Sequence, residues 1–212
     1  MKKLAKIVCA VLAAAMTVVT VAGCGGSSSS FKAETINIGC SGPLTGSAAV
    51  YGTAVNNSAK MAVEEINAAG GLDGIKFAFE MMDDEHKAEK IDNNYASLMD
   101  QGMHISLGTV TSTPCLAWND LAVQDNLFCL TPSATDDAAH NGNNVFQMCF
   151  ANAGQGAGAA TYIKGLLDND SNLKLGIFYK SDDTYSNGIY NQFIGNFLKN
   201  LDIKLYIHIF IS

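Results

Sequence analysis

The sequence predicts an α/β protein, with one lobe built on a doubly wound parallel sheet and an incomplete second α/β lobe after it. Two observations favour this class. Short apolar runs alternate along the chain with longer amphipathic stretches, and several apolar runs are followed directly by loops rich in glycine, serine and threonine. Strands that alternate with helices form right-handed βαβ units, and such units build parallel sheets.

The N-terminal segment is typical of an export signal rather than of a folded element. Lysines in the first six residues precede an uncharged run at 7–23, which is at the short end for a bilayer span. Val21-Ala22-Gly23-Cys24 resembles the lipobox of bacterial lipoproteins, whose cysteine carries diacylglycerol. We therefore predict a lipoprotein signal peptide at 1–23, lipidation of Cys24 and a flexible Gly/Ser tether at 24–33. The alternative is an uncleaved anchor helix.

The first lobe is expected to span residues 34–150. Its first helix is predicted from a stripe of apolar residues at helical spacing, Val55, Ala59, Ala62, Val63 and Ile66, and glycines close this helix and the next one. The expected order is strand 36–40, helix 51–69, strand 75–82, helix 87–101, strand 105–108, helix 113–124, strand 127–130 and strand 145–150.

The alternation starts again after residue 150 and defines the second lobe, residues 151–212. We expect a helix at 155–167, a strand at 174–179, a helix at 185–200 and a strand at 203–211. A lobe with so few strands would leave long strand edges and an uncovered apolar face. The sequence therefore indicates a truncated protein or one with a divergent tail.

The charge balance makes nucleic acid and anionic membranes unfavourable partners. The 13 basic residues are all lysines and stand against 20 acidic residues, which gives a net charge of −7. Such a surface repels phosphates. Small ligands remain compatible with this charge.

Cysteine counting leaves four thiols in the predicted lobes, at Cys40, Cys115, Cys129 and Cys149. Export permits disulfides. The chain has no CxxC, however, and Cys129 and Cys149 fall within apolar runs that are expected to be buried strands. We favour free, buried thiols over disulfide bridges, whose pairing the sequence alone does not define.

Three loops that follow predicted strands carry the residues best suited to bind a ligand. They are 41–46, 108–113 and 131–135, and in a parallel sheet all three lie at the same edge. Their hydroxyl groups, together with the free N–H groups of helix N-termini, can bind an anionic group such as a carboxylate. Ordinary helix capping explains any single loop. Three loops at one edge, with Tyr51 nearby, favour a pocket.

Five segments, in this order, resemble the branched-chain amino-acid binding proteins of ABC transporters, of the leucine/isoleucine/valine type. They are ETINIGCSGPLTGSAAVYG, AVEEINAAGGLDG, the Asp83-Asp84 pair, GTVTSTPCLA and TPSATDD. The resemblance implies a periplasmic-binding-protein fold in which two α/β lobes close on a free amino acid. It also implies a receptor, either periplasmic or a lipoprotein, that delivers its ligand to permease subunits in the membrane.

The same resemblance assigns ligand-binding residues by position. The hydroxyls of Ser112 and Thr135 are expected to bind the α-carboxylate, and Tyr51 to lie against the side chain of the ligand. Tyr185 matches a cleft residue of the second lobe, whereas the family's acidic partner for the α-ammonium group lies beyond the last residue of this chain. The full implied set is Tyr51, Val110, Thr111, Ser112, Ser133, Ala134, Thr135 and Tyr185.

A glycine-rich motif leaves a second interpretation open. Residues 154–159 satisfy G-x-G-x-x-A, with Asp182 or Asp183 at the end of the next strand, which is typical of dinucleotide binding. The preferred interpretation is that these small residues merely open the first helix of the second lobe.

Histidines and acidic clusters favour structural roles. The histidines at 86, 104, 140 and 208 lack the spacing of a zinc site and are expected to be surface or structural residues. The acidic clusters at 83–85 and 136–137 are interpreted as favourable charges at helix N-termini.

The leading hypothesis is an extracytoplasmic solute-binding receptor of an ABC importer, anchored by lipid to the outer face of the cytoplasmic membrane or on its periplasmic side. Its ligand is expected to be a free, branched-chain aliphatic amino acid, captured by hinge closure without a chemical reaction, cofactor or metal. We expect a monomer whose protein partners are the permease subunits. The alternatives are a ligand-sensing receptor domain of the same fold and an exported nucleotide-dependent enzyme.

Overall fold

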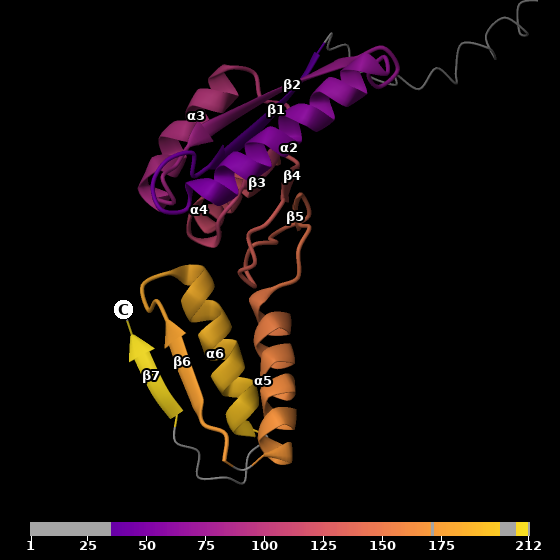
Figure 1. The fold of residues 1–212 in the computed structure, drawn as a ribbon. Helices are drawn as coiled ribbons and strands as arrows, with labels where there is room; N and C mark the ends of the chain where they lie inside the picture. Colours follow the sequence, from indigo (N-terminus) through magenta and orange to yellow (C-terminus); the bar gives the residue numbers. More distant parts are fainter. Residues whose placement is uncertain (1–34, 171, 200–206, 212) are drawn as a thin grey trace, which may run out of the picture. The chain divides into compact units, whose positions relative to one another are not determined.

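The computed structural model describes residues 35–170, 172–199 and 207–211 and confirms the predicted α/β class (Figure 1). Strands and helices alternate along the described chain, and all pairs of named strands are parallel. The predicted signal peptide, the tether and Cys24 lie outside the described residues, as do residues 203–206 of the last predicted strand. No helix among the described residues is both long and apolar enough to cross a membrane.

The first sheet has five parallel strands in the order β2-β1-β3-β4-β5. The order of the strands changes direction between β1 and β3, because β2 lies on one side of β1 and the later strands lie on the other. All five carboxyl ends lie at one edge, which is where open α/β sheets bind ligands. The strands are β1 (Thr35–Gly42), β2 (Lys76–Asp83), β3 (Ile105–Thr109), β4 (Cys129–Thr131) and β5 (Val145–Gln147).

Helices connect the first four strands of the first sheet, and a loop without a helix leads from β4 to β5. The helix predicted at 87–101 is divided into a 3-10 turn and an α-helix, and it ends before Gly102 as expected. Gly102 adopts a φ of 79°, and its N–H donates to the carbonyl of Met99; left-handed backbone of this kind favours glycine. The elements are α2 (Ala49–Ala68), the 3-10 turn η1 (Ala88–Lys90), α3 (Ile91–Asp100) and α4 (Ser112–Gln124).

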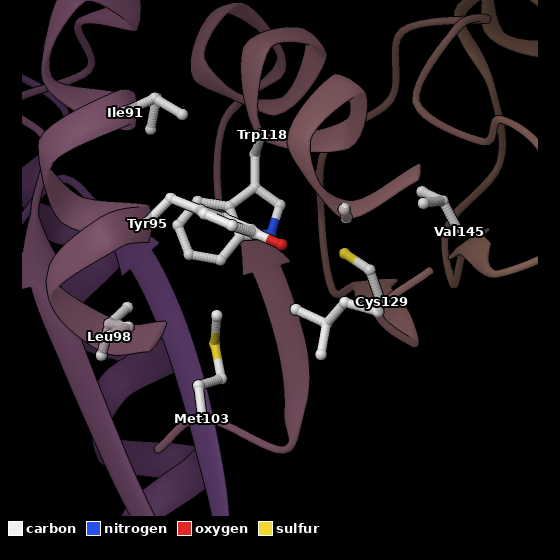
Figure 2. Close-up of a cluster of buried hydrophobic side chains, with 9 residues drawn as sticks. Ile91, Tyr95, Leu98, Met103, Trp118, Cys129 and Val145 are labelled. Carbon is white, nitrogen blue, oxygen red and sulfur yellow. The ribbon is translucent and has the colours of Figure 1, made fainter. Parts of the chain in front are cut away.

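The core of the first sheet forms around Trp118 of α4 (Figure 2). Its indole is fully buried and meets the Tyr95 ring of α3 edge to face, with 4.9 Å between the ring centroids. The indole Nε1 donates a hydrogen bond to the Ser106 hydroxyl in β3 at 3.0 Å, which satisfies the one polar atom of the ring. The cluster comprises Ile91, Tyr95, Leu98, Met103, Trp118, Ala122, Leu127, Cys129 and Val145.

The apolar stripe predicted for α2 is only partly correct. Two of its members, Ala62 and Ile66, are exposed, and the others are half-buried. At the last turn Asn67 takes the inward position: its side chain donates to the Phe77 carbonyl at 2.8 Å and accepts the Phe77 N–H at 2.9 Å. These two polar bonds anchor the last turn of α2 to β2. A hydrophobicity pattern does not reveal such an anchor.

The second sheet pairs β6 (Leu175–Tyr179) with β7 (Ile207–Ile211) in parallel register. Two helices belong to it, α5 (Asn152–Asn169) and α6 (Thr184–Lys199). α5 begins three residues before the predicted start. The two helices pack on each other, and Ala160, Phe193 and Phe197 are buried together between them.

The acidic residues at 136 and 137 are predicted to act at a helix N-terminus. Asp137 does so, and Asp136 does not. One carboxylate oxygen of Asp137 accepts the Ala153 N–H in the first turn of α5, and the other accepts the Gln192 side-chain amide of α6, both at 3.0 Å. Asp136 instead accepts the Ala138 N–H at 2.9 Å within its own turn. Asp137 therefore ties both helices of the second sheet to the loop after β4.

The glycine-rich motif at 154–159 lies inside α5 and not in a loop between a strand and a helix. The dinucleotide interpretation is therefore wrong, and the structural one is confirmed. Gly156 is buried where α5 meets α6, and a Cβ on it would lie 2.5 Å from Gln192 Cβ and 2.6 Å from the Phe193 nitrogen. The absence of a side chain at this position allows the close approach of the two helices.

The four cysteines of the described chain are free, as predicted. Three are buried, and burial raises the pKa of Cys115 to about 11 and that of Cys129 to about 12. Cys149 is half-buried and lies beyond β5, which ends at Gln147 rather than at residue 150. The chain turns there toward the loop after β4, where the Cys149 thiol bonds to the Ala134 carbonyl.

Replacing Gly156 with alanine should lower the free energy of unfolding by about 1–3 kcal/mol, because the added methyl group overpacks the contact between α5 and α6. The matched control is Gly158→Ala in the same helix, where a Cβ meets nothing within 4 Å. There the better helix propensity of alanine should add about 0.5–1 kcal/mol of stability. Chemical denaturation measures both changes. Equal stability of the two variants would contradict the close helix contact.

Candidate functional site

A pocket of about 480 Å³ lies at the carboxyl edge of the first sheet. Every loop that follows a strand of this sheet contributes to it, and so do α5, the loop after β6 and the start of α6. This is the place predicted for a ligand site in an open α/β sheet. The lining residues are Ala48, Tyr51, His86, Val110, Thr111, Ser112, Pro132, Ser133, Thr135, Cys149, Phe150, Gln155, Asp183 and Tyr185.

Seven of the eight residues predicted to bind a ligand line this pocket, and they come from four separate segments of the chain. Ala134 is the exception. This residue is 1% exposed and packs with Cys115 and Ala139, so its side chain faces the core and not the pocket. Ser133 and Thr135, on either side of it, line the pocket, because successive side chains of an extended segment point to opposite sides.

Ser112 and Thr135 form a buried hydrogen-bonded unit in the pocket wall. Ser112 Oγ accepts the Thr135 N–H at 3.2 Å, and the Thr135 hydroxyl donates to Asn152 Oδ1 at 2.8 Å. The two residues are 2% and 7% exposed. Ser112 is the first residue of α4, whose leading N–H groups have no acceptor within the helix. Oriented hydroxyls beside a helix N-terminus suit a carboxylate.

Hydroxyl groups also fix the loops after β3 and β4 to each other. The Ser133 hydroxyl donates to the Val110 carbonyl at 2.6 Å, and the Thr131 hydroxyl donates to the Thr109 carbonyl at 2.7 Å. The acceptors are backbone carbonyl groups at the carboxyl end of β3. The two hydroxyl-rich loops therefore hold one another in register across the pocket floor.

The Asp83-Asp84 pair organises the first loop of the pocket and does not lie at a helix N-terminus, which corrects the sequence interpretation. Asp83 is the last residue of β2, and its carboxylate accepts the Leu44 N–H, the Thr45 N–H and the Thr45 hydroxyl, at 2.9, 3.3 and 2.5 Å. Partial burial acts to raise the pKa of Asp83. These bonds, with one from the Glu85 N–H, outweigh burial and hold the pKa below its usual range.

Asp84 is fully buried between β1 and the turn that follows β2. Its carboxylate accepts the Ser41 hydroxyl at 3.2 Å and the His86 N–H at 2.9 Å. The Ser41 oxygen also accepts a bond from Asn94 Nδ2 at 3.0 Å. Burial raises the pKa of Asp84 to about 6, although the bonds from His86 and Ser41 oppose the increase.

His86 and Asp183 are lining residues that the sequence analysis does not assign to the site. His86 Nδ1 lies 2.8 Å from the Thr111 hydroxyl, and Nε2 lies 2.9 Å from Asp183 Oδ2. The prediction of a surface or structural histidine does not place His86 in the pocket wall, where the structure has it. Its position just after β2 is the signal that could identify it, because every loop after a strand reaches the same edge. No group of three potential metal ligands converges in the described part of the chain.

Aromatic rings give the pocket an apolar side. Tyr51, Phe150 and Tyr185 are 64%, 66% and 45% exposed, so a bound molecule can cover their rings. The sequence does not predict Phe150 as a lining residue, because it lies at the end of an apolar run that predicts a strand up to residue 150. Gln155, in the first turns of α5, also lines the pocket, and no sequence pattern predicts this role.

The fold and the pocket define a class of protein: an α/β protein with a candidate ligand site at the carboxyl edge of a parallel sheet. The chain belongs to the periplasmic binding protein family, whose pattern matches residues 35–207. It is similar to the Leu/Ile/Val-binding protein BraC3 of Rhizobium johnstonii, with 34% identity over 130 residues, which are 60% of this chain and 35% of the relative. Leu/Ile/Val-binding protein homolog 3 of Brucella melitensis is 29% identical over 160 residues, which are 74% of this chain and 42% of the relative.

Solved structures share the fold. The substrate-binding protein LivJ of the branched-chain amino acid transporter of Streptococcus pneumoniae, in complex with isoleucine, is 27% identical with a TM-score of 0.70, over 84% of this chain and 50% of that chain. The leucine-binding protein LivK of Thermotoga maritima has a TM-score of 0.70 at 23% identity, over 84% of this chain and 49% of that chain. The chain thus spans half or less of the length of these relatives.

Replacing Asp84 with asparagine should remove a pH-dependent loss of stability. The pKa of Asp84 in the folded chain, about 6, lies above the ordinary value of an unfolded aspartate, so the folded chain binds the proton more tightly. The wild type should therefore lose about 3 kcal/mol between about pH 4 and about pH 6 through this group, and remain at the lower level above that range. Denaturation curves of both proteins across this range measure the difference.

Asp83→Asn is the control, because the pH dependence of stability due to Asp83 has the opposite sign to that of Asp84. Because the pKa of Asp83 is lowered on folding, its carboxylate adds stability above the unfolded pKa, and this contribution is lost as the pH falls. The wild type should exceed Asp83→Asn in stability more at neutral pH than in acid. If Asp84→Asn and the wild type show the same pH profile, the buried carboxyl does not titrate as described.

Proposed function

We propose that the chain acts as an extracytoplasmic receptor of an ABC importer, which captures a free amino acid and delivers it to permease subunits in the membrane. Membership in the periplasmic binding protein family supports the receptor role. Relatives named as Leu/Ile/Val-binding proteins, and a similar structure solved with isoleucine, support a branched-chain aliphatic ligand. Capture of this kind needs binding groups and a conformational change, but no catalytic group.

The observation that carries the proposal is the convergence of Ser112 and Thr135 at the N-terminus of α4. A carboxylate placed there can accept bonds from hydroxyls and from the leading N–H groups of the helix, and the helix dipole favours its negative charge. We assign the α-carboxylate of the ligand to this wall. Val110, Thr111 and Ser133 line the pocket beside it.

Asn152 can free the Thr135 hydroxyl to donate to this carboxylate. Its Nδ2 is buried without a partner, while its Oδ1 accepts the Thr135 hydroxyl. If the amide turns over, Nδ2 donates to Thr135 Oγ1, and the hydroxyl proton of Thr135 is released toward the pocket. Ligand binding would then satisfy a buried N–H group that is otherwise unpaired.

The aromatic side of the pocket is assigned to the aliphatic group of the ligand. The family resemblance predicts Tyr51 at the side chain of the ligand and Tyr185 as a cleft residue, and Phe150 adds a third exposed ring. Covering apolar surface of this kind contributes about 25 cal/mol for each Å² removed from water. The ring surfaces therefore favour an apolar aliphatic side chain over an anionic one.

Export and anchoring complete the proposal. The lipoprotein signal peptide at 1–23, the lipid on Cys24 and the tether at 24–33 would hold a first lobe at 34–150 and a second lobe at 151–212 at the outer face of the membrane. The composition of the Gly/Ser segment supports a flexible tether. We propose that the receptor acts as a monomer beside its permease.

Adding L-leucine, L-isoleucine or L-valine to the purified chain should raise the midpoint of thermal unfolding. Only the native state binds, so the added stability grows with ligand concentration and reaches about 2.7 kcal/mol at a hundredfold excess over Kd. L-aspartate is the control, because its side-chain carboxylate would lose water against the aromatic side of the pocket. An unchanged midpoint with all three aliphatic amino acids would contradict the proposed function.

Ser112→Ala and Thr135→Ala should each weaken binding of the amino acid by about 1–3 kcal/mol, because a charged acceptor loses a donor. Isothermal titration calorimetry measures the loss. Ser58→Ala on α2, which is exposed and outside the pocket lining, is the control and should bind as the wild type does. Wild-type affinity in both pocket variants would refute the placement of the carboxylate.

A further inference from the structure

His86 joins two walls of the pocket through both nitrogens of its ring. Nδ1 bonds with the Thr111 hydroxyl in the loop that leads into α4, at 2.8 Å, and Nε2 bonds with Asp183 just before α6, at 2.9 Å. The side chains of His86 and Asp183 are 28% and 12% exposed. The pair is thus largely shielded from solvent and still lines the pocket.

The chemistry of the partners decides which ring nitrogen carries a proton. A carboxylate accepts hydrogen bonds and donates none, so Nε2 must be the donor to Asp183. In the neutral imidazole Nδ1 is then the acceptor, and the Thr111 hydroxyl points its proton at it. The remaining lone pairs of the Thr111 oxygen are left as acceptors on the pocket side.

The surroundings of His86 hold this arrangement in place. Asp183 is fixed because its second oxygen accepts the Ser186 N–H at 2.8 Å and caps α6. The carboxylate of Asp84 accepts the backbone N–H of His86. The carboxylate of the neighbouring Glu85 forms ion pairs with Lys87 and Lys90. No other carboxylate, imidazole or ammonium group lies among the described residues that line the pocket.

A second hydrogen bond, which does not involve His86, joins the same two walls. The Thr113 hydroxyl in α4 donates to the Thr184 hydroxyl at the start of α6, at 3.0 Å. The two walls therefore keep one bond when the ring of His86 is replaced. His86 also belongs to none of the buried apolar clusters of the described chain, so variants at this position should fold.

We propose that His86 is a positioning residue for solute binding: it holds the Thr111 wall and the α6 wall at a fixed spacing and orients the Thr111 hydroxyl. Its oxygen then accepts a hydrogen bond from the α-ammonium group of a bound amino acid. This inference rests on the proposed receptor function. The Thr111 oxygen would then be the acceptor for the ammonium group, and it lies in the loop after β3, beside the wall that is assigned to the carboxylate.

The first test compares the affinity for L-leucine of the full chain and three variants by calorimetry. His86→Phe keeps a ring but removes both bonds, and it should weaken binding roughly tenfold or more. His86→Gln retains one donor and one acceptor and should recover part of the loss. His140→Phe, at an exposed position outside the pocket lining, should bind as the wild type does. Wild-type affinity in His86→Phe, or equal losses in both variants at position 86, would overturn the proposal.

The second test uses imidazole nitrogen NMR of the full chain without any amino acid. The wild type should show a protonated His86 Nε2. Asp183→Asn, which still caps α6, should shift the Nε2 signal, and Thr111→Val should shift the Nδ1 signal, while the other histidines keep theirs. His86 signals that ignore both substitutions would overturn the proposal. A chain that shows these shifts but binds no amino acid would instead contradict the receptor function.

Discussion

The hydrogen bond between the Trp118 indole and the Ser106 hydroxyl determines the geometry of the pocket. It lies in the fully buried core where α3 and α4 pack on the first sheet. The same Ser106 oxygen accepts the Gly108 N–H at 2.7 Å, where the backbone turns with a φ of 61° into the loop at 109–111. One side chain thus fixes both the body of α4 and the loop before it. Leaving the indole N–H unpaired would cost about 1–3 kcal/mol.

Carboxylates shape the pocket by binding backbone N–H groups. Asp83 holds the loop after β1, Asp84 holds the turn that contains His86, and Asp183 caps α6. Loops at the end of a sheet have few partners for their N–H groups, and a carboxylate can accept several such bonds at once. Part of the acidic composition is therefore structural. It supports a pocket in which the wall formed by Ser112, Ser133 and Thr135 carries uncharged hydroxyls.

Segments that follow strands of both sheets line the pocket. Thr111 and Ser112 follow β3 of the first sheet, whereas Asp183 and Tyr185 follow β6 of the second sheet. A ligand that touches both sets stabilises the conformation in which they face each other, which is the physical basis of capture by closure. The bonds of His86 act on the same equilibrium, because they join the same two walls.

The sequence by itself determined the order of strands and helices, the parallel sheet and the three hydroxyl-rich loops, because periodicity and loop composition are local properties. It also brought Ser112, Thr135 and Tyr51 to one edge, since parallel strands place their carboxyl ends together. Only the tertiary structure decided that Ala134 faces the core and that His86 bridges the walls. Side-chain direction and contacts across 97 residues depend on packing between elements, which no local pattern records.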